Sequence, residues 1–374
     1  MRNLKTLLVT VLILITANVI SQVRYYASNR VLNAVNTYQE DGTYIEEFIE
    51  KDAGGLSNPQ DIVLHPEGFL LVTGTNNPQI KKFDLETGAF LGDWSDSSFD
   101  LTRPSKMAIG PDDKLYVTQW GTTAETSKIV HFDLAGNYLG AFTPSAPQGL
   151  GLVWDEDGNL YISLFGITIG SGTVKKYDTN GNFLETFIDT TVLQSPASLW
   201  WDTNGDLLVQ DYTEGKVLRY SSTGDYIDDF ITGLINPEGH TYLPNGNLLI
   251  SDRGDNKIIE YEANGNLVGR WDNGGTLAGP NFIKAIDITM GLSENTRNAI
   301  FVTPTIGNRF NINPEISHHF STIEVLSISG RLVDSIQPRD TAVWNASNLN
   351  EGLYILNAIN SKGAKTVQKI IIKH

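Results

Sequence analysis

The sequence predicts an all-β protein: a six-bladed β-propeller closed two-plus-two by N-terminal strands, followed by a small β-sandwich. Three observations support this prediction. First, a repeat of four short apolar runs, called the phrase below, recurs along most of the chain. Second, Gly, Asn or Asp occupies the same tight turn in nearly every copy. Third, a different alternating pattern begins near Phe310. Repeats of ~40–50 residues that each hold several strands are typical of propeller blades.

Residues 1–21 are predicted to form a secretory signal peptide. Arg2 and Lys5 give a basic start, an apolar stretch runs from Leu7 to Ile15, and Ser21 offers a small residue before a cut at Gln22. The apolar run is shorter than the ~20 residues of a transmembrane helix, so we expect no such anchor in the mature protein. The alternative is an uncleaved N-terminal anchor.

The propeller is predicted over residues 22–305, from the recurrence of the second apolar run of the phrase. Its copies are Leu70–Thr73, Leu115–Thr118, Leu160–Ser163, Leu207–Gln210, Leu248–Ser251 and Ile300–Thr303, at intervals of 45, 45, 47, 41 and 52 residues. All but the last follow a tight turn such as Asn204-Gly205, because Gly, Asn and Asp tolerate the positive φ of a two-residue hairpin.

Closure of the ring is predicted from the incomplete sixth copy. Residues 280–303 would supply only the first two strands of that blade. The N-terminal segment Val35–Phe48 matches Val217–Phe230 position for position, so we predict that it supplies strands three and four. Such closure removes the open sheet edges that a linear array would expose.

The chain from 306 to 374 is predicted to form a β-sandwich of about seven strands or fewer. Alternating runs such as Ile323–Ile328 and Leu353–Leu356 are separated by Gly turns, and the chain ends in the apolar and basic run Val367–Lys373.

Composition excludes several classes of function. The formal net charge is −16 and the pI about 4.7, so nucleic acid and anionic membranes are poor partners. The chain has no cysteine, which excludes disulfides, zinc–thiolate sites and cysteine nucleophiles.

Candidate functional residues lie in the loops between strands two and three and in those leading into strand one. In a propeller these loops gather on one face around the central channel, where binding sites form. The converging set is Asp61, Arg103, Lys106, Gln119, Trp120, Gln148, Phe165, Ser198, Asp211, Tyr212, Glu238, His240, Asp252, Arg253 and Asn281. Its polar and aromatic mixture suits a small molecule or a glycan, and the alternative for each residue is an ordinary solvated loop position.

Two subsets suggest chemistry. Asp211, Glu238 and Asp252 offer hard oxygen ligands for Ca²⁺ or Mg²⁺. Glu238 and His240 lie two residues apart and form a candidate general base, with a structural histidine as the alternative for His240.

The stretch Asn247–Ile258 resembles the NHL repeat, which also underlies the streptogramin lyase-like and gluconolactonase-like six-bladed propellers. The resemblance covers about residues 29–305. It implies the fold, and it leaves lyase, lactonase and binding activities open because the fold hosts all three. Gluconolactonase-like relatives hold a divalent ion with Glu, Asn and Asp, and streptogramin lyases pair His with Glu beside a magnesium ion.

The C-terminal segment resembles the type A sorting domain of the type IX secretion system of Bacteroidetes. The matching residues are Asn313-Pro314, Ser329–Val333, Leu349, Gly352-Leu353-Tyr354 and Lys369–Lys373. The family usually starts with Pro-Asn-Pro, whereas this chain has Asn-Pro-Glu. The resemblance implies handling by the secretion machinery, export through the outer membrane, and release or attachment at the cell surface.

The leading hypothesis is a secreted or cell-surface binding protein, a monomer, that presents its loop face to a glycan, peptide or protein. The alternative is a metal-dependent lyase or lactonase of the streptogramin lyase or gluconolactonase-like type, with Glu238 and His240 as catalytic candidates and Ca²⁺ or Mg²⁺ as cofactor. The ligand-binding candidates are Asp61, Arg103, Lys106, Gln119, Trp120, Asp211, Tyr212 and Arg253.

Overall fold

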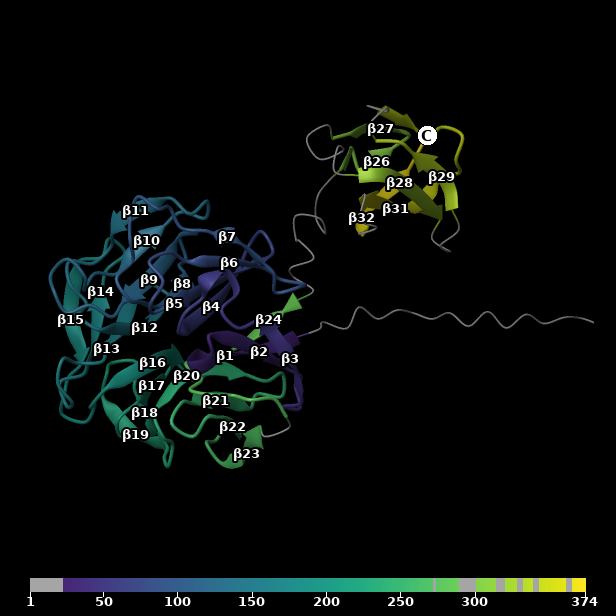
Figure 1. The fold of residues 1–374 in the computed structure, drawn as a ribbon. Helices are drawn as coiled ribbons and strands as arrows, with labels where there is room; N and C mark the ends of the chain where they lie inside the picture. The colour runs from purple at the N-terminus through teal and green to yellow at the C-terminus, as the bar shows by residue number, and fades with distance from the viewer. Residues whose placement is uncertain are drawn as a thin grey trace, which may run out of the picture.

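The computed structural model describes residues 23–271, 274–288, 301–313, 320–327, 332–338, 343–360 and 365–374. The predicted signal peptide lies outside these residues. Six four-stranded antiparallel sheets form the blades of a β-propeller, as predicted. Figure 1 shows them arranged around a common centre, with β24 beside β1 where the ring closes.

Blades one to five are each continuous in sequence. The first blade consists of β4 (Pro59–His65), β5 (Phe69–Gly74), β6 (Lys81–Asp84) and β7 (Phe90–Asp93), and the second of β8 (Pro104–Ile109), β9 (Leu115–Gln119), β10 (Val130–Phe132) and β11 (Tyr138–Ala141). The third blade consists of β12 (Gly149–Trp154), β13 (Leu160–Leu164), β14 (Thr173–Tyr177) and β15 (Phe183–Ile188), and the fourth of β16 (Pro196–Trp201), β17 (Leu207–Asp211), β18 (Lys216–Tyr220) and β19 (Tyr226–Ile231). The fifth blade consists of β20 (Pro237–Tyr242), β21 (Leu248–Asp252), β22 (Lys257–Tyr261) and β23 (Leu267–Trp271). In each blade the first strand faces the centre and the fourth lies outside.

The sixth blade corrects the predicted two-plus-two closure. Its strands, in spatial order, are β24 (Ile283–Asp287), β1 (Val23–Asn29), β2 (Ala34–Tyr38) and β3 (Tyr44–Ile49). The C-terminal side therefore supplies only the first strand and the N-terminal side supplies three. The assignment of Val35–Phe48 to strands three and four is confirmed, whereas strand two is β1, which pairs with β24 from Val23↔Asp287 to Ala27↔Ile283.

Neighbouring blades are joined by a repeated contact between a turn glycine and an aromatic residue. Gly181, in the turn before β15, has φ +79°, and a Cβ placed on it would meet the carbonyl oxygen of Phe142 in the preceding blade. The equivalent glycines are Gly42, Gly88, Gly136, Gly224 and Gly265, which lie against Trp271, Phe48, Trp94, Phe187 and Phe230. The same contact occurs between every pair of neighbouring blades. These glycines are therefore needed for the packing of one blade on the next as well as for the positive φ of the turn.

The propeller core lies between adjacent sheets. One cluster joins Tyr161 of the third blade to Leu199 and Leu207 of the fourth. The rings of Tyr161 and Trp201 meet edge to face, with centroids 5.1 Å apart. This T-shaped geometry is favourable for aromatic pairs and fills the widening gap between two blades. Two short 3₁₀ helices, η1 (Arg30–Leu32) and η2 (Ala53–Gly55), accompany the sixth blade.

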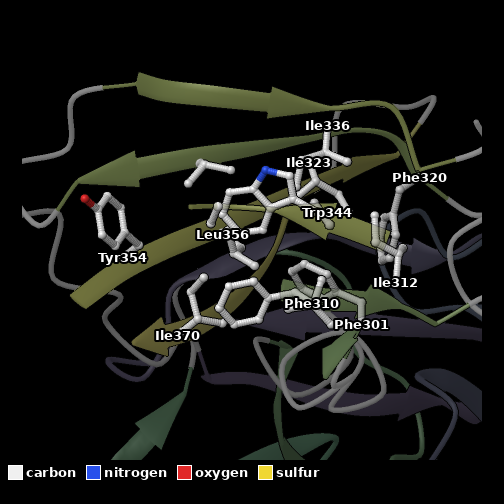
Figure 2. Close-up of a cluster of buried hydrophobic side chains, with 14 of the residues drawn as sticks. Phe301, Phe310, Ile312, Phe320, Ile323, Ile336, Trp344, Tyr354, Leu356 and Ile370 are labelled. Carbon is white, nitrogen blue, oxygen red and sulfur yellow. The ribbon is translucent and has the colours of Figure 1, made fainter. Parts of the chain in front are cut away.

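The second domain has eight strands in its described residues, in two sheets. They are β25 (Val302–Thr303), β26 (Ile306–Gly307), β27 (Arg309–Ile312), β28 (Phe320–Ser327), β29 (Leu332–Ile336), β30 (Val343–Asn345), β31 (Gly352–Asn360) and β32 (Lys365–Ile372). The three-stranded sheet has the order β25-β27-β30 and the five-stranded sheet the order β26-β32-β31-β28-β29. Figure 2 shows Trp344 and Phe310 packed between them, with ring centroids 5.3 Å apart.

The prediction that Ile300–Thr303 belongs to the sixth blade is wrong for Phe301–Thr303, and Ile300 lies outside the described residues. β25 pairs with β27, and Phe301 and Val302 are buried in the core of the second domain. The buried side chain of Gln368 fixes this segment: its Oε1 accepts the backbone amides of Phe301 (2.9 Å) and Val302 (3.0 Å), and its Nε2 donates to the Val302 carbonyl (2.7 Å). This strand therefore belongs to the second domain, ahead of the predicted start at residue 306.

Candidate functional site: a cationic and aromatic pocket on the loop face

A pocket of about 200 Å³ opens on the loop face, which is the face where the loops between strands two and three gather. Every blade contributes to it at the same place, through the residue that directly follows its second strand. These six residues, called the upper tier, are all half-buried. They are Arg30, Thr75, Trp120, Phe165, Tyr212 and Arg253.

Repeated backbone hydrogen bonds position the upper tier. The amide of Trp120 donates to the carbonyl of Arg103 (3.0 Å), and the amide of Tyr212 donates to that of Ser195 (2.9 Å). Thr75, Phe165 and Arg253 make the same bond to Asn58, Gln148 and Asn236. Each acceptor directly precedes the first strand of its blade. Arg103 and Gln148 adopt the same left-handed conformation there, with φ of 48° and 50°, and the exposed side chain of Arg103 lines the pocket.

A lower tier forms the wall beneath and comes from the start of strand one. Its six residues occupy equivalent positions, each following a Pro or Gly, and all are buried: Gln60, Ser105, Leu150, Ala197, Glu238 and Asn281. All but Ala197 line the pocket. Asn281 Nδ2 donates to Gln60 Oε1 at 2.7 Å, while Asn281 Oδ1 and Glu238 Oε2 have no hydrogen-bond partner among the described residues. Asn281 Oδ1 is therefore a free acceptor of the lower tier, whereas Glu238 Oε2 lies within ion-pair distance of Arg253.

The pocket has an excess of positive charge. Its lining includes Arg30, Arg103 and Arg253 but only one carboxylate, Glu238, whose Oε2 lies 3.5 Å from Arg253 Nη1. Burial, reinforced by the charge of Arg253, lowers the pKa of Arg30. Within the described part of the chain, neither Arg30 nor Arg103 has an ion-pair partner. A protein of net charge −16 thus concentrates uncompensated cations in one pocket, an arrangement that favours an anion.

Three consecutive blades contribute an aromatic arc to the opposite wall. The rings of Trp120 and Phe165 have centroids 4.9 Å apart, and those of Phe165 and Tyr212 are 5.5 Å apart, both edge to face. The guanidinium carbon of Arg253 lies 5.6 Å from the centroid of the Tyr212 ring, within cation–π range. These contacts hold Arg253 between a ring and a carboxylate.

A second, smaller cavity of about 70 Å³ lies deeper in the channel. Lys106 of the second blade is buried at this level, and its Nζ donates to the carbonyls of Gln60 in the first blade (2.9 Å) and Asn281 in the sixth (2.5 Å). Burial lowers the pKa of Lys106, and the charges of Asp61 and Glu238 oppose that shift. Glu238 lines both cavities, so it lies between them.

His240 belongs to this deeper cavity. Its ring stacks on Trp200 with centroids 3.8 Å apart, and its Nδ1 lies 2.9 Å from Ser198 Oγ. Burial, followed by the charges of Lys284 and Lys106, lowers the pKa of His240 well below its ordinary value. The imidazole is therefore neutral at physiological pH and is a weak base.

The predicted site residues separate into three groups. Arg103, Trp120, Tyr212, Glu238 and Arg253 come together in the pocket of the loop face, with Phe165 and Asn281. Asp61, Lys106, Ser198 and His240 line the deeper cavity. Gln119, Gln148, Asp211 and Asp252 line neither.

The side chains of Gln119, Asp211 and Asp252 accept hydrogen bonds from the backbone instead. Each ends the second strand of its blade and accepts the amide of the residue two places before strand one: Gln119 from Thr102 (2.8 Å), Asp211 from Gln194 (2.6 Å) and Asp252 from Ile235 (2.7 Å). Among the described residues there is no group of three or more His, Cys, Asp or Glu that could hold a metal ion. The structure therefore does not bring Asp211, Glu238 and Asp252 together as a ligand set.

Sequence reasoning missed five lining residues: Arg30, Gln60, Thr75, Ser105 and Leu150. The signal that could have found them is the repeat itself. Arg30 lies 45 residues before Thr75 and Thr75 lies 45 before Trp120, so extending the period backwards from a predicted site residue reaches both.

Fold and pocket define the protein as a six-bladed β-propeller with a cationic and aromatic pocket on its loop face. Residues 300–373 match the family described as secretion system C-terminal sorting domain. The chain therefore carries a type IX sorting domain, which indicates export to the cell surface or secretion. No helix of the described residues has the length and apolar character needed to cross a membrane.

Solved structures resemble the propeller. A protein of unknown function from Bacteroides caccae is 17% identical, with a TM-score of 0.55 over 71% of this chain and 99% of its own. A chain of a nidogen–laminin complex is 15% identical, with 0.54 over 70% and 98%. A protein described as a gluconolactonase is 14% identical, with 0.50 over 63% and 82%. Likeness at these identities shows the fold alone, and no curated protein matches the chain.

Proposed function

We propose that this is a secreted or cell-surface binding protein that holds its ligand at the pocket of the loop face. One observation supports this most directly: all six blades place a half-buried residue at the same position around one pocket, and the six differ in chemistry. A position that blade construction leaves free to vary, and that converges on a cavity, is suited to recognition.

The lyase or lactonase alternative is less well supported. Asp211 and Asp252, which it needs as metal ligands, accept backbone amides, Asp252 through Oδ2 alone, and neither lines the pocket. Its candidate base His240 stacks on Trp200 in the deeper cavity, where burial lowers its pKa. Glu238 is the one candidate of that set that reaches the pocket, and it lies beside Arg253. This arrangement favours binding over proton abstraction.

A binding screen with a pocket variant tests the proposal. The mature protein is screened by thermal shift against arrays of glycans, peptides and small organic acids, and the screen is repeated with Trp120→Thr. Threonine occupies the equivalent place in the first blade, at Thr75, so this variant keeps the blade intact. We expect at least one ligand whose affinity falls roughly tenfold in the variant, since a lost aromatic contact costs about 0.5–1.5 kcal/mol beyond its area.

Arg219→Gln is the matched control, because Arg219 lies on β18 away from the pocket and pairs with Asp228. Binding should be unchanged in this variant and in the presence of a chelator. The proposal fails if no ligand of any class binds, or if every ligand found binds Trp120→Thr as tightly as the natural protein.

A further inference from the structure

Exposed aliphatic side chains lie close in sequence to pocket-lining residues in two parts of the loop face. Val31 is 64% exposed and Ile235 is 53% exposed. In the other part, Ile167 and Ile169 are 66% and 73% exposed. We call Val31 and Ile235 the first rim, and Ile167 and Ile169 the second rim. Each rim residue lies within a few positions of a residue that lines the pocket.

The first rim is continuous with the arginine side of the pocket. Val31 directly follows Arg30 and packs near Gly279, where a Cβ would lie 3.3 Å from Val31 and 3.9 Å from the side chain of Arg253. Ile235 packs against Gly254, the residue after Arg253. The rim therefore brings two aliphatic side chains next to Arg30 and Arg253.

The second rim lies in the third blade, which faces the sixth across the ring. Its loop is held in place: Gly170 and Gly172 donate to the carbonyl of Gln194 (3.3 and 3.1 Å), and the Thr168 amide donates to Ser171 Oγ (3.1 Å). Ile167 and Ile169 therefore lie on a loop that hydrogen bonds hold in place, with their side chains exposed to solvent. A partner that covered them would bury this apolar surface, which is favourable.

We propose that the loop face binds an extended polypeptide segment, with one acidic side chain of the segment in the pocket and aliphatic side chains on the two rims. The inference rests on the proposed function. The acidic group follows from charge complementarity, because three arginines face one carboxylate in the pocket. A free small ligand would fill the pocket and leave both rims exposed.

The rims also favour a polypeptide over a glycan. Saccharide rings pack on aromatic faces and present hydroxyls, whereas Val31, Ile167, Ile169 and Ile235 offer only aliphatic surface. In an extended segment the side chains at i and i±2 point the same way. The acidic residue at i would therefore enter the pocket while the residues at i−2 and i+2 reach opposite rims.

Fluorescent nonapeptides with the central motif Leu-x-Glu-x-Leu test this, with binding followed by polarisation on the full mature chain. We expect Gln in place of the central Glu to weaken binding by about tenfold or more, since hydrogen bonds to charged groups are the stronger ones. Replacing both leucines by serine should weaken it about five- to tenfold. Rising salt should weaken the Glu peptide more than the Gln peptide.

Protein variants locate the contact. Arg103→Gln removes an unpaired guanidinium, and Gln148 has the same backbone conformation at the equivalent place, so this variant should fold. It should bind the Glu peptide about tenfold more weakly and the Gln peptide unchanged. Ile167→Ser with Ile169→Ser should weaken both peptides several-fold. Arg219→Gln should change neither.

Three outcomes would overturn the inference alone. The first is equal affinity for the Glu and Gln peptides, and the second is peptide binding that Arg103→Gln leaves unchanged. The third is selective binding of acidic glycans at the pocket with no peptide binding, which would refute the polypeptide while leaving the proposed function standing. Absence of binding by every class would refute both.

Discussion

Asp252 carries a stability penalty that removing its charge should relieve. Its side chain is 1% exposed, and burial raises the pKa of its carboxyl from 3.8 to about 6, against the opposing effect of the Ile235 amide. Oδ2 accepts that amide at 2.7 Å, while Oδ1 has no hydrogen-bond partner within the described residues. The sixth blade uses an amide at the equivalent place: Asn29 Oδ1 accepts the amide of Ala278 at 2.9 Å. Asp252→Asn should therefore preserve the hydrogen bond and remove the charge.

The magnitude follows from linkage. A folded-state pKa about two units above the unfolded value means that ionisation costs the folded state about 3 kcal/mol, at 1.36 kcal/mol per unit. Because the folded pKa is raised, the stabilisation exists at low pH and is lost as pH rises from about 4 to about 6. About 2 kcal/mol of that loss falls between pH 4.5 and pH 8. Relative to the natural protein, the variant should gain that amount over the same range.

Urea unfolding of both proteins between pH 4.5 and pH 8 measures the difference directly. Asn29→Asp is the reverse control. Asn29 Nδ2 also donates to the Thr276 carbonyl at 2.7 Å, so a carboxylate there would face an oxygen and should destabilise increasingly with pH. A difference between Asp252→Asn and the natural protein that stays constant across this range would refute the reasoning, because only a titrating group makes the difference depend on pH.

Three further predictions concern the ring, the second domain and export. Gly181→Ala should destabilise the propeller by about 2 kcal/mol or more, because it adds a clash with Phe142 to the strain of positive φ; Gly205→Ala, at φ +83° with open space around it, should show only the strain in urea unfolding. Gln368→Leu should leave the amides of Phe301 and Val302 unpaired, at a cost of roughly 3 kcal/mol; hydrogen exchange should accelerate there and not in the blades. Removing residues 300–374 should leave a folded propeller in the periplasm, which cell fractionation would show, and arrival of the truncated chain at the cell surface would contradict the role of the sorting domain.

How far the fold could be predicted depends on the range of the interactions. Blade strands follow from local alternation and turn residues, so β5, β9, β13, β17 and β21 begin at or within a residue of the predicted runs. The closure pairs β1 with β24, about 260 residues apart, and local pattern carries no information on such a pairing. Both Val23–Asn29 and Ile300–Thr303 could have formed strand two of the sixth blade. The sequence does not distinguish them, because an apolar run that pairs in a β-sandwich looks the same as one that pairs in a blade.

Prediction of the candidate site was limited in the same way, because only residues next to a recognisable strand could be found from local pattern. Trp120, Tyr212 and Arg253 could be predicted because they directly follow a recognisable strand. Arg30 was missed because strand two of the sixth blade was assigned to Ile300–Thr303 instead of Val23–Asn29. The role of Asp211 could not be read from composition: an acidic residue at a strand end suggests a metal ligand, whereas the structure directs its oxygens to the backbone amides of Gln194, Ser195 and Glu214. Such hydrogen bonds depend on two loops meeting, which only the folded ring determines.

Lys106 links three blades beneath the pocket. Its ammonium group donates to the backbone carbonyls of Gln60 and Asn281, which belong to two other blades. The charge of Lys106 is opposed there by Asp61 and Glu238, whereas Arg30 and Arg103 above it have no ion-pair partner among the described residues, so the positive charge is concentrated toward the mouth of the pocket. The half-buried upper tier and the two rims are the surfaces that a partner approaching the loop face meets first, so selectivity of the proposed binding should depend on them more than on the deeper cavity around His240.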